Sequence, residues 1–404
     1  MVAAAVLISA VVGSALLGRL ASMFKQPIVL GSMVWGILSA TAFHGLAPSA
    51  SAVLADSHSL PSEVGNLGLI LVVAAVAHSV RALRLQSDGP TGWVRHSAAI
   101  VVAVAGPGIL AATVIFGLGT PQLLIPTTLP SSLFLVLAVS VTAVPVLASI
   151  VREAGISDHV AVRRCMTVSI LTDGVAWLGL TALLLATVSA TSWDGGDAIH
   201  AAILALAGAA GSLVAGSTVS VRVATAAIIV SAVSLGYAAD IVGAHPSIGA
   251  AIAGISMRPS SAVAAAFVKL EPWLHRLLLP IFIVVASAHA PLQLLGQAGV
   301  SAATTVSWLL GLCLFVKFVP GIASGIGFGM RTMDCFIYSS LLNCRGVTEL
   351  VIASIGLRSG LLTPVGFACL AIVALISTVF TGPVAALARL SRKTCVDSPQ
   401  PLRR

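Results

Sequence analysis

The apolar stretch Cys165–Ala186, CMTVSILTDGVAWLGLTALLLA, decides the fold class, because it is long enough to cross a bilayer and yet contains an aspartate. A helix needs about 20 residues to span the roughly 30 Å hydrocarbon core. An ionised carboxylate near its centre costs roughly 2.5–3.5 kcal/mol on insertion scales, so such residues usually face a cavity and mark an ion or proton path. Asp173 is therefore the first candidate site residue. Three more ionisable residues, Lys317, Arg345 and Glu349, lie at comparable depth in other apolar segments.

The composition is that of a polytopic α-helical membrane protein. Of 404 residues, 58% are hydrophobic and 8% are charged, and the mean hydropathy is +1.08. A soluble domain could not bury that much apolar surface. We expect about thirteen transmembrane helices, or twelve if the two segments divided only by Arg222 are one. They are expected near Val2–Leu17, Pro27–Phe43, Gly65–Leu83, His96–Leu118, Ser131–Val151, Val160–Val188, Ala198–Val219, Val223–Ala239, Gly243–Met257, Trp273–Leu295, Val300–Ile322, Cys335–Leu357 and Leu362–Leu387.

The basic residues fall on one side of this arrangement when the N-terminus is placed outside and the C-terminus in the cytoplasm. Of the 21 Lys and Arg, Lys317 and Arg345 lie within the membrane and only Arg358 lies outside. This asymmetry follows the positive-inside rule and predicts a multi-pass protein of the cell membrane. Because the basic residues follow the membrane surface, the net charge of +8 does not call for a nucleic-acid partner.

Two of the expected helices carry polar, helix-weakening strings at mid-membrane. Residues 137–150 read LAVSVTAVPVLASI, and residues 339–353 read SSLLNCRGVTELVIA. Proline and glycine weaken a helix, and freed backbone groups survive in a membrane only when they are buried in protein or line a cavity. Kinked packing helices are one interpretation. Interrupted helices in corresponding halves of a transporter are the other, and they indicate inverted repeats that meet at a binding site.

The repeat interpretation sets the domain organisation. A transmembrane domain is expected over residues 1–390, followed by a short cytoplasmic tail over 391–404. Within the domain, the first repeat runs from about 2 to 188, a linking helix from about 198 to 219, and the second repeat from about 223 to 387. Six scattered cysteines show no paired spacing, so neither a disulfide nor a resident metal or other cofactor is expected.

Several strings resemble segments of the monovalent cation:proton antiporter-2 family, the sodium/hydrogen exchanger-like bacterial membrane transporters. They are SVTAVPVLASIVREAGI (140–156), SILTDGVAW (169–177), AHPSIGAAIAGISMRP (244–259), LLPIFIVVASAHAPL (278–292) and LLNCRGVTELVIASIGL (341–357), and the likeness covers nearly the whole chain. The resemblance implies a fold with two crossing broken helices and a homodimer. It also implies that Asp173 binds cation and proton alternately, with Thr142 lending oxygens to the ion.

The same resemblance places Lys317, Arg345 and Glu349 at the family's charged positions around the second break, where Asn343 supports the network. The chain departs from the family pattern at three places. Thr172 replaces the acidic residue or asparagine that usually precedes the key aspartate, Ser32 replaces an acidic residue, and Ser287-Ala288-His289 replaces a family glycine-leucine.

The residues also suggest a mechanism. Burial favours a neutral carboxyl group and a nearby cation favours the ionised form, so one half-buried carboxylate can hold a proton or a metal ion but not both. Na⁺ or K⁺ prefers oxygen ligands, which Asp173, Thr172, Thr142 and Ser140, with the carbonyls of Ser140 or Val141, can supply. A single carboxylate predicts one proton per cation, an electroneutral exchange. We expect Arg345 and Glu349, spaced i,i+4, to form a structural ion pair.

Two other functions remain open at this stage. The altered residues Thr172, Ser32 and His289 leave room for proton- or sodium-coupled transport of an organic ion. A transport-inactive membrane scaffold or sensor is the other alternative, although a sensor is expected to carry an output domain. An enzyme is not expected, because the sequence shows no nucleophile–base set, metal triad or phosphate-binding loop.

Overall fold

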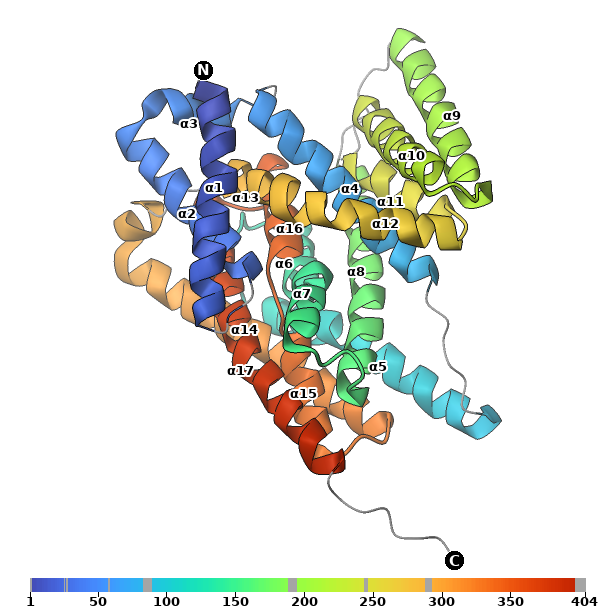
Figure 1. Ribbon diagram of the computed structural model, residues 1–404. Helices are drawn as coiled ribbons and strands as arrows, with labels where there is room; N and C mark the ends of the chain where they lie inside the picture. The colour runs from blue at the N-terminus through green and yellow to red at the C-terminus, as the bar shows by residue number, and fades with distance from the viewer. Residues whose placement is uncertain are drawn as a thin grey trace, which may run out of the picture.

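Helices account for all the regular structure in the computed structural model, which describes residues 2–24, 26, 28–56, 59–82, 89–187, 195–242, 246–287 and 293–396 (Figure 1). Several predicted features lie outside these described residues. They are the helix boundaries at Pro27, Leu83, Val188 and Gly243, the departure at Ala288-His289, and residues 397–404 of the tail.

Within the described residues, seven helices are long and apolar enough, by length and composition, to cross a membrane. Four shorter apolar helices accompany them. The seven candidate spans are Val2–Met23, Arg95–Leu118, Val160–Leu184, Asp197–Ser217, Val221–Ile241, Leu295–Gly327 and Pro364–Leu390. The expected class, a multi-pass α-helical membrane protein, is confirmed.

One group of helices is drawn from the beginning and the middle of the chain. In it α1 packs on α2, α4 packs on α11, α10 lies between α9 and α11, and α13 packs on α2 and α4 (Figure 1). The members are α1 (Val2–Met23), α2 (Ile28–Leu46), α3 (Pro48–Ala55), α4 (Leu60–Ala82), α9 (Gly195–Ser217), α10 (Val221–Ile241), α11 (Pro246–Ser256), α12 (Ser261–Trp273), the π-helical turn η1 (Leu274–Leu278) and α13 (Leu279–Ser287).

The second group carries all four ionisable candidate residues. Here α14 contacts α5, α15 and α17, and α8 contacts α6 and α15. The members are α5 (Gly89–Leu118), α6 (Leu129–Ser140), α7 (Val144–Ala154), α8 (Val160–Thr187), α14 (Gln293–Gly327), α15 (Thr332–Leu342), α16 (Val347–Arg358) and α17 (Pro364–Val396). The two groups touch where α8 meets α4, α13 meets α16, and α17 meets α2.

Local sequence explains why α6 begins at Leu129. Thr128 precedes the helix in an extended conformation, and its hydroxyl accepts a hydrogen bond from the Ser131 backbone N–H at 3.3 Å. That bond satisfies one of the helix's unpaired amide donors. Pro130 stands in the first turn, where no backbone donor is needed.

Two helices of the structure were not expected from hydropathy. The short α3 follows α2 directly, and α12 lies largely in the segment between the helices expected near Gly243–Met257 and Trp273–Leu295. Ala262, Val263, Ala266 and Leu270 of α12 are buried, while Val268 is exposed. α12 has 13 residues, fewer than the roughly 20 that a membrane-length apolar window requires.

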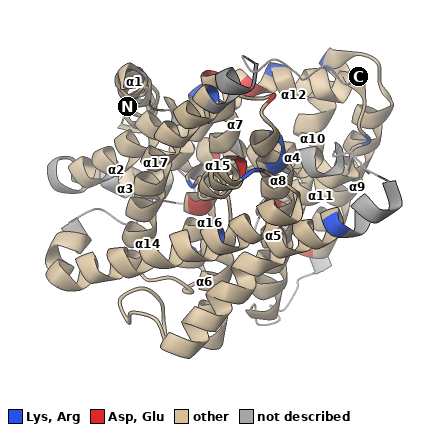
Figure 2. Cartoon of the chain, turned by 90° about the horizontal axis from the view of Figure 1, so that it is seen from below, with Lys and Arg blue, Asp and Glu red and all other residues tan. Residues whose placement is uncertain are grey.

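The largest apolar core extends through both groups and includes the residues around both interrupted strings, among them Val141, Ala143, Leu342 and Cys344. Figure 2 shows a predominantly uncharged chain, with a few charged segments near the centre, beside α8, α15 and α16, in addition to those at the periphery. Asp173, Lys317, Arg345 and Glu349 are at most 1% exposed, so charged groups lie inside the same apolar body that the sequence predicted to be in the membrane.

Candidate functional site

The first interrupted string is a break between two half-helices. α6 ends at Ser140 and α7 begins at Val144, and Val141 between them has extended backbone angles (φ −77°, ψ 151°). Pro145 is the second residue of α7, a position where proline fits because the first helical turn has no use for its missing donor. The break is buried: Val141, Thr142 and Ala143 are all at most 2% exposed.

The second interrupted string forms a matching break. α15 ends at Leu342 and α16 begins at Val347. Gly346 precedes α16 with a positive φ of 155°, and a Cβ atom at this position would lie 2.6 Å from Val146 Cγ2 of α7. Glycine is the residue that allows both this backbone angle and this close approach.

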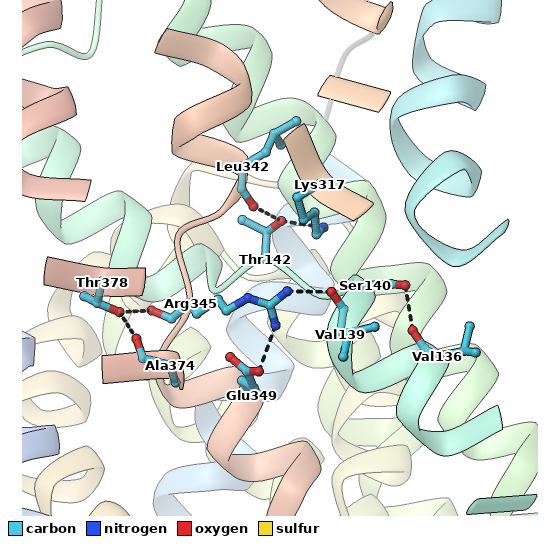
Figure 3. Close-up of polar contacts among 10 residues, drawn as sticks. All are labelled: Val136, Val139, Ser140, Thr142, Lys317, Leu342, Arg345, Glu349, Ala374 and Thr378. Carbon is cyan, nitrogen blue, oxygen red and sulfur yellow. Dashed lines mark hydrogen bonds and ion pairs between the residues drawn. The ribbon is translucent and has the colours of Figure 1, made fainter. Parts of the chain in front are cut away.

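The two breaks are hydrogen-bonded to each other. The Ala143 backbone N–H donates to the Cys344 carbonyl at 2.9 Å, and the Thr142 hydroxyl donates to the Leu342 carbonyl at 2.9 Å. In the opposite direction, the Arg345 guanidinium donates through Nη2 to the Val139 carbonyl at 2.6 Å (Figure 3). Each break thus supplies donors for carbonyls that the other leaves without a helical partner, which explains how two broken helices remain stable in an apolar core.

Asp173 lies on α8 against the first break and is completely buried. Neither carboxylate oxygen has a hydrogen-bond partner among the described residues. The backbone N–H groups of Thr142 and Val144 and the Lys317 ammonium interact with it electrostatically, without completing well-formed hydrogen bonds. A buried carboxylate without a well-formed hydrogen bond retains its capacity to accept a proton or to coordinate a cation.

Lys317 enters the site from α14 and is 1% exposed. Its Nζ donates to the Thr142 hydroxyl at 2.8 Å, and that hydroxyl donates in turn to the Leu342 carbonyl (Figure 3). The lysine is therefore anchored to both breaks through one threonine, while its positive charge acts on Asp173 through space. Snorkelling to the surface, the alternative for a membrane lysine, does not occur here because the ammonium is buried.

Arg345 and Glu349 form a buried ion pair. Arg345 Nη1 lies 2.8 Å from Glu349 Oε1, and both side chains are at most 2% exposed. Glu349 Oε2 and Arg345 Nε have no hydrogen-bond partner among the described residues. Because Arg345 also binds the Val139 carbonyl, the pair connects the start of α16 to the end of α6.

The other predicted site residues are Thr172, which precedes Asp173 on α8, and Ser140 and Asn343 at the breaks; all three are buried and use their polar groups locally. The Thr172 hydroxyl donates to the Val168 carbonyl at 2.8 Å, and the Ser140 hydroxyl donates to the Val136 carbonyl at 2.6 Å. Asn343 Nδ2 donates to the Ser339 carbonyl at 3.1 Å. These bonds occupy the hydroxyl protons of Thr172 and Ser140, and leave their oxygen lone pairs able to accept or to coordinate.

Sequence reasoning did not identify Thr378 of α17 or the backbone carbonyls of Val139 and Leu342. Thr378 donates to the Arg345 carbonyl at 2.6 Å. The available signal was weak, because a threonine within an apolar helix commonly bonds to its own preceding turn. The carbonyls carry no side-chain signal, and they become visible only when the positions where the helices end are known.

The chain is similar to known antiporters over most of its length. The family model described as "Sodium/hydrogen exchanger, transmembrane" matches residues 7–388. The chain is 25% identical over 393 residues to K(+)/H(+) antiporter 1 of Saccharomyces cerevisiae, covering 91% of this chain and 44% of that protein. It is 24% identical over 391 residues to Na(+)/H(+) antiporter NhaS4 of Synechocystis, covering 91% and 92%.

Among bacterial relatives, the Na(+)/H(+)-K(+) antiporter GerN of Bacillus cereus is 24% identical over 392 residues, with 91% of this chain and 92% of that protein covered. The chain therefore spans less than half the length of the yeast relative and nearly all of the two bacterial ones. Among solved structures, the sodium proton antiporter MjNhaP1 from Methanocaldococcus jannaschii at pH 8 matches with a TM-score of 0.63 at 16% identity, covering 96% of this chain and 98% of that one. This last likeness concerns the fold.

Proposed function

Since the chain belongs to the sodium/hydrogen exchanger family of membrane transporters, we propose that it is a secondary antiporter that exchanges a monovalent cation, Na⁺ or K⁺, for protons. The observation that carries the proposal is Asp173, which is fully buried beside two broken helices with both carboxylate oxygens free of hydrogen-bond partners among the described residues. Relatives that transport Na⁺ and K⁺ against H⁺ support the class of cargo.

In this proposal Asp173 binds proton and cation in turn. The protonated carboxyl group is neutral, and the ionised one attracts a cation, so the two positive species compete for the same oxygens. A hard cation prefers oxygen ligands. The proposed ligands are the Asp173 carboxylate, the hydroxyl oxygens of Thr142, Thr172 and Ser140, and the carbonyls of Ser140 or Val141.

The charge inventory supports one proton per cation. Two basic side chains, Lys317 and Arg345, and two acidic ones, Asp173 and Glu349, are buried in this part of the chain. Glu349 is paired with Arg345, and Lys317 is anchored on Thr142. Asp173 is then the one carboxylate left to exchange its positive partner, and the cycle is electroneutral.

Alternating access follows from two bodies that move past each other. We propose that α6–α7 and α15–α16 are the crossing broken helices of an inverted repeat, with the first repeat over about 2–188, the linking helix over about 198–219 and the second repeat over about 223–387. The hydrogen bonds between the breaks, and the fact that each helix group draws on both halves of the chain, support this division.

The remaining features complete the proposal. The positive-inside distribution supports a cell-membrane protein with its N-terminus outside and its C-terminus in the cytoplasm. A homodimer through the group that contains α1 and α9 is proposed on the family resemblance.

Transport in proteoliposomes tests the function. Purified protein is reconstituted with an internal pH dye, and external Na⁺, K⁺ or Li⁺ is added to the parent, to Asp173→Asn and to the control Asp197→Asn, which changes an exposed carboxylate at the start of α9. We expect one of these ions to drive proton movement in the parent and the control but not in Asp173→Asn. Full activity of Asp173→Asn would eliminate the role of Asp173, and strong dependence of the rate on imposed voltage would contradict one-for-one exchange.

A further inference from the structure

The carbonyl of Arg345 is a backbone group that the helices leave unpaired. α16 begins at Val347, and its first backbone bond runs from the Leu350 N–H to the Gly346 carbonyl. The Arg345 carbonyl therefore lies one residue before the ladder of α16. In a buried break such an acceptor needs a partner from elsewhere in the protein.

Thr378 of α17 supplies that partner. Its side chain is completely buried, and its hydroxyl oxygen lies 2.6 Å from the Arg345 carbonyl and 2.7 Å from the Ala374 carbonyl (Figure 3). One hydroxyl carries one proton, which can serve one of these acceptors fully at a time. Ala374 lies inside α17, where its carbonyl is already within the helical ladder, so the Arg345 carbonyl is the acceptor that depends on Thr378.

Arg345 is the residue through which the second break holds the first. Its guanidinium binds the Val139 carbonyl at the end of α6 and the Glu349 carboxylate in α16. The backbone of Arg345 is held from α17, and its side chain reaches into the other break. A shift of the Arg345 backbone would therefore move the guanidinium and, with it, the end of α6 next to the Ser140–Thr142 oxygens.

We propose that Thr378 is a positioning residue that sets the geometry of the cation ligands at the first break through Arg345. The proposal rests on the proposed exchange function and adds to it a contribution from α17, a helix that carries none of the charged residues of the site. It makes the hydroxyl of Thr378, and not its volume, the feature that matters for cation affinity.

The test compares Thr378→Val, which keeps the shape and removes the hydroxyl, with Thr378→Ser, which keeps the hydroxyl. Thr305→Val is the matched control, because Thr305 is also buried and its hydroxyl donates to the Ser301 carbonyl of its own helix at 2.8 Å. Two quantities are measured: the cation concentration that gives half-maximal exchange in proteoliposomes, and the rate of amide hydrogen exchange over residues 343–350 in detergent.

Removal of the hydroxyl leaves the Arg345 carbonyl unpaired, so we expect about a tenfold rise in the half-saturating cation concentration of Thr378→Val, and about tenfold faster amide exchange. The maximal rate is expected to change less than the half-saturating concentration. Thr378→Ser and Thr305→Val are expected to stay within about threefold of the parent. Equal behaviour of Thr378→Val and Thr305→Val, or of the serine and valine variants, would overturn the proposal.

The two measurements separate this inference from the function it rests on. If the parent moves none of the three cations, the exchange function fails, while amide exchange over residues 343–350 still decides whether Thr378 holds the break. If Thr378→Val does not fold, the comparison of Thr378→Ser with Thr378→Ala isolates the hydroxyl in the same way.

Discussion

The buried ion pair between Arg345 and Glu349 gives a quantitative prediction about the stability of the paired breaks. Arg345→Met leaves the Glu349 carboxylate buried without its partner, and Glu349→Leu leaves the guanidinium buried with the Val139 carbonyl as its remaining acceptor. Loss of one member of a buried pair typically costs about 3–5 kcal/mol, because a desolvated charge remains. Each single variant is therefore expected to lose about that much free energy of unfolding.

The double variant Arg345→Met/Glu349→Leu separates the effect of an unpaired charge from the loss of a contact. Replacement of both charges by apolar side chains removes the desolvation cost, and is often neutral. The Val139 carbonyl loses its donor, however, which costs about 1–3 kcal/mol. We expect the double variant to be about 1–3 kcal/mol less stable than the parent and more stable than either single variant.

The assay is reversible unfolding in mixed detergent micelles, followed by far-ultraviolet circular dichroism over a titration with denaturing detergent. All four proteins are measured at the same pH and lipid content, so that the thermodynamic cycle closes. Additive losses in the double variant would refute the reasoning, because they would mean that the two side chains act independently. Losses below about 0.5 kcal/mol in both single variants would refute it as well.

Three further predictions concern the breaks and the carboxylate. Gly346→Ala is expected to reduce the folded fraction measured by size-exclusion chromatography, because the new Cβ would lie 2.6 Å from Val146 Cγ2. The double variant Gly346→Ala/Val146→Ala is expected to recover part of the folded fraction. No recovery would show that the positive φ alone causes the loss. Thr142→Val removes the hydrogen-bond acceptor of Lys317 and the donor to the Leu342 carbonyl, so it is expected to lower the transport rate in proteoliposomes at least tenfold. Thr142→Ser keeps the hydroxyl and is expected to retain most of the rate. Equal rates for the valine and serine variants would mean that the hydroxyl has no role. In the proposed mechanism a proton and the cation compete for Asp173, so the half-saturating cation concentration is expected to fall about tenfold for each unit rise in pH within the range of competition. A pH-independent value would exclude a shared site.

The sequence was informative where a single segment contains the whole signal. Asp173 was located by its position inside an apolar run, and the structure places it in α8 with no exposure. The two interrupted strings were located by proline, glycine and polar residues, and the structure has a helix end in each. The roles assigned to these residues stay predictions, because burial and helix ends do not by themselves show transport.

The sequence was uninformative where a contact joins distant segments. Lys317 donates its hydrogen bond to Thr142, 175 residues away in the chain, and the sequence around neither residue indicates this contact. Charge pairing suggests an acidic partner, but a hydroxyl held at a helix break is equally able to accept from an ammonium. The contribution of Thr378 has the same origin, since its partner is a carbonyl that is exposed for bonding only because α16 begins two residues later.

Proton release on cation binding tests the central claim most directly, because it needs neither a membrane potential nor a complete transport cycle. Purified parent and Asp173→Asn proteins are held in weakly buffered detergent solution and titrated with Na⁺ and K⁺, while a pH-sensitive dye reports free protons. The parent is expected to release close to one proton for each cation bound, and the variant none. Cation binding by the parent without proton release, or equal release by Asp173→Asn, would contradict competition of the two ions for the carboxylate of Asp173.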